Sequence, residues 1–223
     1  MYRVFEDRHE AGQALADDIK RTELRNPIVL ALPRGGVPVA YEVAKAINAQ
    51  LDIIVVRKLG APLQPELAIG AIASGGVRVL NDELIDRIPG LDQATIEAIA
   101  RKEMQELERR EQAYRGDRTY PDLAERQVLL VDDGMATGAT MRAAVQAVRA
   151  RHPSQIIVAV PTGSVSAVRE VASLADKVIC LESPSEFYAV GQFYRRFTQT
   201  SDDEVREYLD KARETGSGDE PVN

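Results

Sequence analysis

The sequence predicts an α/β fold, in which a parallel sheet of about five strands carries flanking helices. Two observations support this prediction. Short apolar runs alternate along the chain with helical patterns, which is typical of strand–helix–strand units. These runs contain few polar residues, as expected for strands that are buried on both faces of a parallel sheet. The expected strands are residues 27–32, 51–58, 127–133, 155–163 and 177–183.

Three helices are expected between these strands, over residues 37–51, 138–151 and 164–176. The second shows the clearest pattern, because Met141, Ala144, Val145 and Val148 form one apolar stripe at helical spacing. A stripe of this kind packs against a sheet and leaves the opposite face of the helix in water.

The stretch between the second and third strands interrupts the alternation. Residues 69–80 read as a hairpin that turns at Ser74-Gly75-Gly76, and residues 91–114 read as one long helix. The other face of that helix is crowded with charge. Two interpretations remain open: a solvated face with mutually supporting charge pairs, or arginines that reach over a site. The arginines concerned are Arg109, Arg110 and Arg115.

Length and composition favour one soluble domain. The chain has 223 residues, a net charge of −7 and one cysteine, which excludes an internal disulfide. The acidic balance argues against nucleic-acid binding, and no apolar run is long enough to cross a membrane. Without a signal-peptide segment, we expect a cytoplasmic protein. We expect one domain over residues 1–214, with a core of about 26–183, an insertion of about 70–126 and a disordered tail at 215–223.

Polar loops follow four of the expected strands. Ligands of open α/β sheets bind at the carboxyl ends of the strands, so these loops should meet at one edge. Each has the glycines, hydroxyls or cations that suit a phosphorylated ligand. They are Pro33–Gly36, Arg57–Gly60, Asp132–Thr140 and Pro161–Ser164.

The third loop gives the most specific signal. Gly134 and Gly138 permit close approach of a ligand, Thr137 and Thr140 supply hydroxyls, and a helix N-terminus follows, where free N–H groups bind phosphate. The spacing matches neither a Walker A loop nor the dinucleotide fingerprint. Asp132 and Asp133 would repel a phosphate if they faced it, but they would accept hydrogen bonds from sugar hydroxyls. A ribose 5-phosphate fits both halves of the loop.

The run "VLLVDDGMATGAT" resembles the phosphoribosyl pyrophosphate (PRPP) signature of type I phosphoribosyltransferases. One position of this run differs from the signature: Gly134 stands where the family usually has an aliphatic residue. The order of elements over about 26–183 is similar to the Rossmann-like core of that family. The whole chain resembles a subgroup whose acceptor is undefined.

The resemblance implies an enzyme that transfers the ribose 5-phosphate group of PRPP to a nitrogenous acceptor, such as a nucleobase, and releases pyrophosphate. Asp132 and Asp133 would bind the ribose hydroxyls, and Met135, Ala136, Thr137, Gly138, Ala139 and Thr140 would hold the 5-phosphate. The expected pyrophosphate-binding residues are Arg34, Gly35, Gly36, Arg57 and Lys58. Mg²⁺ would be held mainly by substrate and water, with no direct protein ligand. The resemblance also implies a homodimer.

The acceptor is not identified by any residue. Ala136 stands where some purine-specific members have an acid, which argues against a 6-oxopurine. Phe187 and Tyr188 either cover a flat acceptor ring or seal the C-terminal segment onto the core. Thr200 or Ser201 should begin a capped C-terminal helix. A regulator that binds PRPP or a nucleotide without transferase activity remains the alternative. A phospho-acceptor receiver domain is disfavoured because the fourth strand ends in Val160-Pro161-Thr162.

Overall fold

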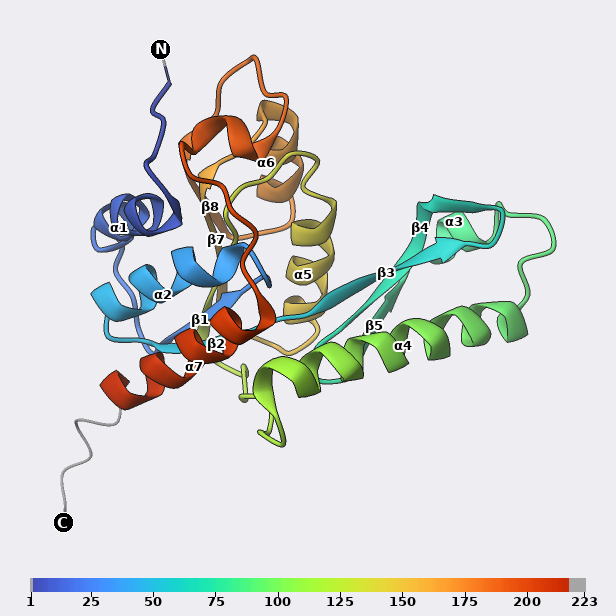
Figure 1. The fold of residues 1–223 in the computed structure, drawn as a ribbon. Coiled ribbons are helices and arrows are strands. Elements are labelled where there is room, and N and C mark those ends of the chain that lie inside the picture. Colours follow the sequence, from blue (N-terminus) through green and yellow to red (C-terminus); the bar gives the residue numbers. More distant parts are fainter. Residues whose placement is uncertain (1, 217–223) are drawn as a thin grey trace.

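The computed structural model describes residues 2–216 and confirms the predicted parallel sheet. Its five strands lie in the order β2-β1-β6-β7-β8, with every pair parallel (Figure 1). The expected disordered tail lies outside the described residues from 217 onward. The strands are β1 (Pro27–Ala31), β2 (Gln50–Ile53), β6 (Gln127–Val131), β7 (Gln155–Thr162) and β8 (Lys177–Glu182).

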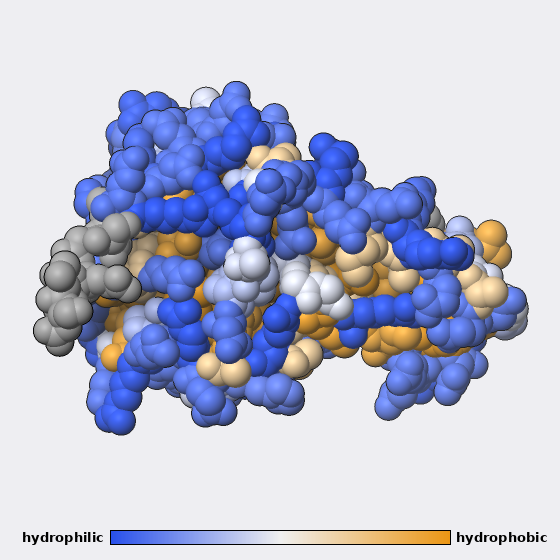
Figure 2. Space-filling view, turned by 90° about the horizontal axis from the view of Figure 1, so that it is seen from below, coloured by the Kyte–Doolittle hydropathy of each residue, from blue (hydrophilic) through white to orange (hydrophobic). Residues whose placement is uncertain are grey.

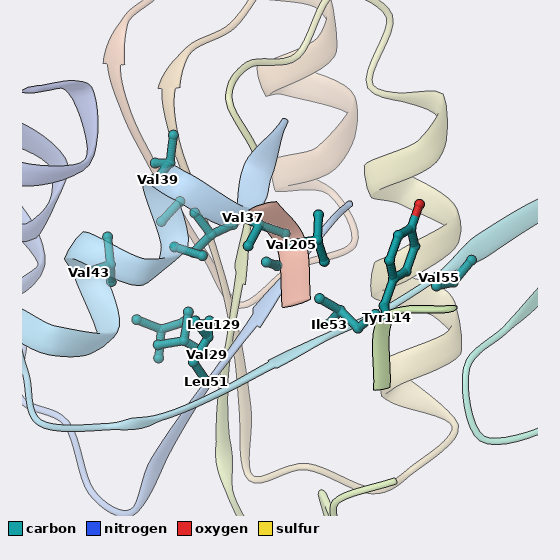
Figure 3. Packing of buried hydrophobic residues seen from close by; sticks show 14 of the residues in the cluster. Val29, Val37, Val39, Val43, Leu51, Ile53, Val55, Tyr114, Leu129 and Val205 are labelled. Atoms are coloured by element: carbon teal, nitrogen blue, oxygen red, sulfur yellow. The ribbon is translucent and has the colours of Figure 1, made fainter. Parts of the chain in front are cut away.

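Helices cover both faces of this sheet because successive strand residues point to opposite sides. Ile28 and Leu30 pack with α5 (Ala139–Arg149) and α6 (Val165–Ala172). Val29 and Ala31 face the other cluster, which Figure 3 shows from close by. Helices α1 (Arg8–Ile19), α2 (Gly36–Ala46) and α7 (Asp202–Gly216) contribute to that second cluster, as does α4 (Gln93–Arg115). The sequence analysis does not predict α1, which begins after the Asp7 cap.

The expected second strand, 51–58, is divided. Its first half is β2, and its second half belongs to β3 (Val56–Ala61), which pairs in a separate antiparallel sheet of order β3-β4-β5. The expected hairpin forms β4 (Gln64–Ala73) and β5 (Val77–Leu80), and the expected long helix is α4 (Gln93–Arg115). With the short α3 (Asp82–Ile85), these elements form an arm, residues 56–115, that projects from the core (Figure 1).

Buried contacts attach the arm to the core. Arg115, at the end of α4, donates two hydrogen bonds to the Asp52 carboxylate on β2, at 2.9 and 3.1 Å, and both side chains are buried. Arg109 and Arg110 instead pair with Glu106 on their own helix. Of the two interpretations of the charged face, the structure therefore favours supporting charge pairs, because none of the three arginines reaches over a site.

The distal end of the arm carries an apolar pocket of about 590 Å³. Leu67, Leu84, Ile88 and Leu91 line it, and Leu63 at its rim is 96% exposed. Seen from below, in Figure 2, hydrophobic residues show between polar ones over the side of the molecule that holds the arm. None of the described helices is long and apolar enough to span a membrane.

The N-terminal segment meets the segment that follows η1 (Val190–Phe193) beside the carboxyl edge of the sheet. The Phe5 N–H donates to the carbonyl of Phe193, which ends η1 (Val190–Phe193), and the Arg195 N–H donates to the Phe5 carbonyl. We call residues 194–201, which connect η1 to α7, the C-terminal strap. The predicted cap of α7 is confirmed at Ser201: its hydroxyl accepts from the Glu204 N–H, and the Glu204 carboxylate accepts from the Ser201 N–H.

Candidate functional site

Asp132 and Asp133 follow β6 directly, at the carboxyl edge of the sheet. The Asp132 carboxylate accepts a 2.8 Å hydrogen bond from the Asp133 N–H. Burial, and then the neighbouring charge of Asp133, raise the pKa of Asp132 well above its usual value. Burial also raises the pKa of Asp133, although the Arg8 guanidinium opposes that rise. Burial thus favours the protonated form of both carboxyls, and only Asp133 has a cation beside it that opposes this effect.

Arg8 is a site residue that the sequence analysis missed. Its Nε and one terminal nitrogen lie 2.9 and 2.8 Å from Asp133 Oδ2, and both side chains are largely buried. A second missed residue is Tyr194, whose hydroxyl donates to the Asp133 carbonyl at 2.6 Å. Helix α1 and the C-terminal strap bring these groups to Asp133. The local sequence signals only a helix start after Asp7, so it gives no indication of a partner so far along the chain.

The loop of residues 33–36 lies against the two acids, as the sequence leads us to expect. A side chain at Gly35 would overlap the Asp133 carboxylate, and a Cβ at Gly36 would lie 2.7 Å from the Val131 carbonyl. The peptide bond between Pro33 and Arg34 is cis. The Arg34 guanidinium, which we expect to bind pyrophosphate, lies 3.4 Å from Asp202 at the start of α7. Gly35 and Gly36 are therefore required for the close packing of this loop against the two acids.

The loop of residues 135–140 has a fixed base and an exposed rim. Met135 is buried, and its N–H donates to the Thr162 carbonyl at 2.9 Å. The Ser164 hydroxyl donates to the Ala136 carbonyl at 2.7 Å, so the loop after β7 supports this one. Gly138 has a φ of 69° and caps α5 without a side-chain hydrogen bond. Thr137 and Thr140 are exposed beside that helix N-terminus, a geometry that suits phosphate.

The departure at Gly134 has a packing explanation. A Cβ there would lie 2.6 Å from a methyl group of Val190 and 2.9 Å from that of Thr162. In this chain η1 therefore fills the space that a larger residue would need. The glycine lets the C-terminal segment cover the turn that follows the acids.

Arg57 and Lys58 are not placed at the end of a core strand, because β3 carries them into the arm. Arg57 pairs with Glu103 of α4 at 2.6 Å. Lys58 is exposed and lines a pocket of about 470 Å³ between the arm and α5, together with Ala139 and Arg142. Neither Asp132, Asp133 nor the Arg34 loop lines that pocket. Lys58 thus lies near the start of α5, whereas Arg57 is turned toward the arm.

Phe187 and Tyr188 lie in different surroundings. The Phe187 ring packs against Phe193 with centroids 5.0 Å apart, in the aromatic cluster that joins Phe5 of the N-terminal segment to Phe193 and Tyr194. Tyr188 is 82% exposed. The geometry of Phe187 favours the sealing interpretation, and Tyr188 has the freedom to approach a ligand.

The two acids are too few ligands to hold Mg²⁺, which prefers octahedral coordination by oxygen atoms. Among residues 2–216, no group of three or more His, Cys, Asp and Glu side chains is placed to hold a metal. A Mg²⁺ ion here would take most of its coordination from substrate oxygens and water.

Comparison with known proteins supports the family resemblance of the run that contains the two acids. The sequence model of the phosphoribosyl transferase domain matches residues 5–197. The chain belongs to the phosphoribosyl transferase family. Its fold, a five-stranded parallel sheet covered by helices on both faces, is an α/β fold. The matched range includes Arg8, the loop of residues 33–36, both acids and Tyr194.

Two relatives extend this comparison. A protein of Mycobacterium tuberculosis, named for an inferred phosphoribosyl transferase activity, is 51% identical over 210 residues. That match covers 94% of this chain but 47% of the relative, so the chain spans about half the length of the curated relatives it matches. A crystal structure from Thermus thermophilus superposes with a TM-score of 0.86 at 41% identity, covering 93% of this chain and 98% of that one.

Proposed function

We propose that this phosphoribosyl transferase transfers the ribose 5-phosphate group of PRPP to a nitrogenous acceptor, a nucleobase in the first instance, and releases pyrophosphate. One observation carries the proposal: the acid pair, the Arg34 loop and the exposed rim at the start of α5 adjoin one another at one edge of the sheet. The acid pair offers hydrogen-bond acceptors for the ribose diol. The Arg34 loop offers a cation and accessible backbone groups for pyrophosphate, and the start of α5 offers free N–H groups for the 5-phosphate.

The proposed reaction breaks the bond between the anomeric carbon and pyrophosphate. The electron pair leaves with the pyrophosphate oxygen, a nitrogen lone pair of the acceptor forms the new bond, and the proton of that nitrogen passes to water. Positive charge develops on the ribose in between, and the Asp133 carboxylate lies in the region where it would favour that charge. Arg34 would balance the charge of the leaving group. Catalysis would come mainly from positioning and electrostatics.

Mg²⁺ would supply charge neutralisation for pyrophosphate when it is bound. We assign it no direct protein ligand. Asp132 and Asp133 would instead hold the ribose hydroxyls, and the loop of residues 135–140 would fix the 5-phosphate. The arm adjoins this edge through Tyr114, whose hydroxyl donates to Asp202 at 3.1 Å beside Arg34.

The test is calorimetric titration of PRPP with Mg²⁺ into the wild type and into the variant Asp132→Asn/Asp133→Asn. We expect binding by the wild type and its loss in the variant, because amides place N–H donors where the hydroxyls need acceptors. Asp17→Asn/Asp18→Asn is a matched control, since it alters an adjacent acid pair on the exposed surface of α1.

Pyrophosphate release in the presence of individual nucleobases then tests the transfer step. Release with one base identifies the acceptor. If the protein binds PRPP tightly but releases pyrophosphate with none of the nucleobases, a regulatory protein that binds PRPP is supported instead. A folded wild type that fails to bind PRPP would overturn the proposal.

A further inference from the structure

Arg8 is enclosed on every side by groups from distant parts of the chain. Two of its nitrogens contact Asp133 Oδ2, and the third, Nη1, donates to the Thr198 carbonyl of the C-terminal strap at 2.7 Å. Its guanidinium carbon lies 4.1 Å from the centre of the Phe197 ring. The side chain is 11% exposed. All three nitrogens and one face of the guanidinium are therefore engaged.

The backbone around Arg8 is equally constrained. Asp7 caps α1 by accepting hydrogen bonds from the N–H groups of His9 and Glu10. The same carboxylate binds Arg196 of the strap at 2.8 Å. The Arg196 N–H in turn donates to the Glu6 carbonyl at 2.9 Å. The N-terminal segment and the C-terminal strap thus hold Arg8 against Asp133 from both sides, so Arg8 loses little further freedom in holding the carboxylate.

The contact leaves one side of the Asp133 carboxylate available. Arg8 uses Oδ2 for both of its bonds, so Oδ1 of the carboxylate takes no part in this contact. A guanidinium in this position also opposes the proton uptake that burial promotes at Asp133. The arginine therefore fixes the direction of the carboxylate and favours its charged form, and it does not use Oδ1, which can accept from a ligand hydroxyl.

We propose that Arg8 is a positioning residue for sugar recognition: it orients Asp133 so that Oδ1 accepts a hydrogen bond from the ribose diol of the ligand. This inference rests on the proposed function, because it assumes that PRPP occupies the site. Lysine would not replace arginine fully, since it lacks the planar fork that holds Oδ2 and the flat surface that stacks on Phe197.

The first experiment compares two probes, PRPP with Mg²⁺ and inorganic pyrophosphate with Mg²⁺, in titrations of the wild type and of Arg8→Gln. We expect Arg8→Gln to weaken PRPP binding about tenfold, as loss of one charge-assisted hydrogen bond does. Pyrophosphate has no diol, so its affinity should stay within about twofold. Arg3→Gln is the matched control: Arg3 lies on the same segment and pairs with Glu10, away from Asp133.

The second experiment follows PRPP binding against pH. In Arg8→Gln the pKa of Asp133 rises, so the carboxylate is protonated to higher pH, and binding should recover as the pH increases. Arg8→Lys keeps the charge and should keep the wild-type pH profile at reduced affinity. The groups facing Asp133 are Arg8 of α1, the adjoining Asp132 and the Tyr194 hydroxyl of the strap; Glu204 of α7 faces Arg8. Gly35 also lies against Asp133, and it carries no charged side chain.

The outcomes separate the two proposals. If the wild type binds PRPP and Arg8→Gln binds it equally well or better, the role of Arg8 is overturned and the proposed function stands. Equal losses for PRPP and pyrophosphate would also overturn it, because they would indicate general disruption of the site. Should Arg8→Gln fail to fold, Arg8→Lys decides the matter, since affinity for PRPP equal to the wild type would then refute the positioning role. A wild type that binds pyrophosphate but no PRPP overturns both.

Discussion

At the scale of single residues, the acid pair shows how residues of a binding site can lower the stability of the native state. Because burial and the charge of Asp133 raise the pKa of Asp132, the native state binds a proton there more tightly than the unfolded chain. The stabilisation that this proton gives is present in full below the unfolded pKa, and it is lost as the pH rises through the raised native pKa. At pH 8, where the unfolded chain carries an ionised Asp132, the raised native pKa therefore reduces stability.

Asp132→Asn should consequently raise the melting temperature at pH 8 by at least about 2 °C, the shift that ~1 kcal/mol gives in a protein of this size. Asparagine is neutral and its Oδ1 still accepts the Asp133 N–H. Near pH 4 the gain should shrink, because the wild-type carboxyl is then protonated. Calorimetric melts at both pH values check this. A lower melting temperature at pH 8 would contradict it.

Cys180 is a second residue whose chemistry follows from burial. Burial raises the pKa of its thiol to about 11, and the sulfur lies 3.3 Å from the Glu182 carbonyl. Since the thiolate is the reactive form, we expect slow reaction with a disulfide reagent at pH 7.5 and fast reaction in denaturing urea. Absorbance of the released thiol measures both rates. Equal rates in the two solutions would show that the thiol is accessible and ionises normally.

At the scale of elements, the arm depends on the ion pair between α4 and β2. Arg115→Ala would leave the Asp52 carboxylate buried without its cation, and loss of one partner of a buried pair typically costs about 3–5 kcal/mol. Urea unfolding should show a loss of this size. Arg109→Ala provides the control on the same helix, because the exposed pair with Glu106 should contribute nothing measurable. Similar midpoints for the two variants would show that the Asp52 contact does not stabilise the protein.

The packing of η1 on the turn after the acids is a separate element-scale contact. Gly134→Ala should destabilise the protein by about 1–3 kcal/mol, the usual cost of overpacking, because the new methyl group meets Val190. Val190→Ala removes that obstacle, so the double variant should recover part of the loss. The coupling energy of the double-mutant cycle measures this contact. Additive effects would mean that Val190 does not fill the space beside Gly134.

For the whole molecule, the parts that sequence patterns predict are those with local causes. Apolar runs and their spacing predicted the five-stranded parallel sheet, and glycine and acid spacing indicated a phosphate loop before α5. The division of residues 51–58 was not predicted, because Ile53, Ile54 and Val55 continue one apolar run while the strand partners change. Arg8 was missed for a related reason: its partner is 125 residues away, and only the packing of α1 and the strap brings them together.

Ligand binding should stabilise the whole fold if the proposed function is right. PRPP would contact loops after β1 and β6, so it binds only where the sheet is assembled, and unfolding must release it. At a ligand concentration 100 times the dissociation constant this linkage adds about 2.7 kcal/mol, which corresponds to a rise of about 5–10 °C in melting temperature. Thermal melts with PRPP and Mg²⁺ measure the shift, with ribose 5-phosphate and pyrophosphate as separate controls. The Asp132→Asn/Asp133→Asn variant should show little shift, since its contacts to the diol are gone. A wild-type melting temperature that PRPP leaves unchanged would count against the assignment of this edge of the sheet as the PRPP site.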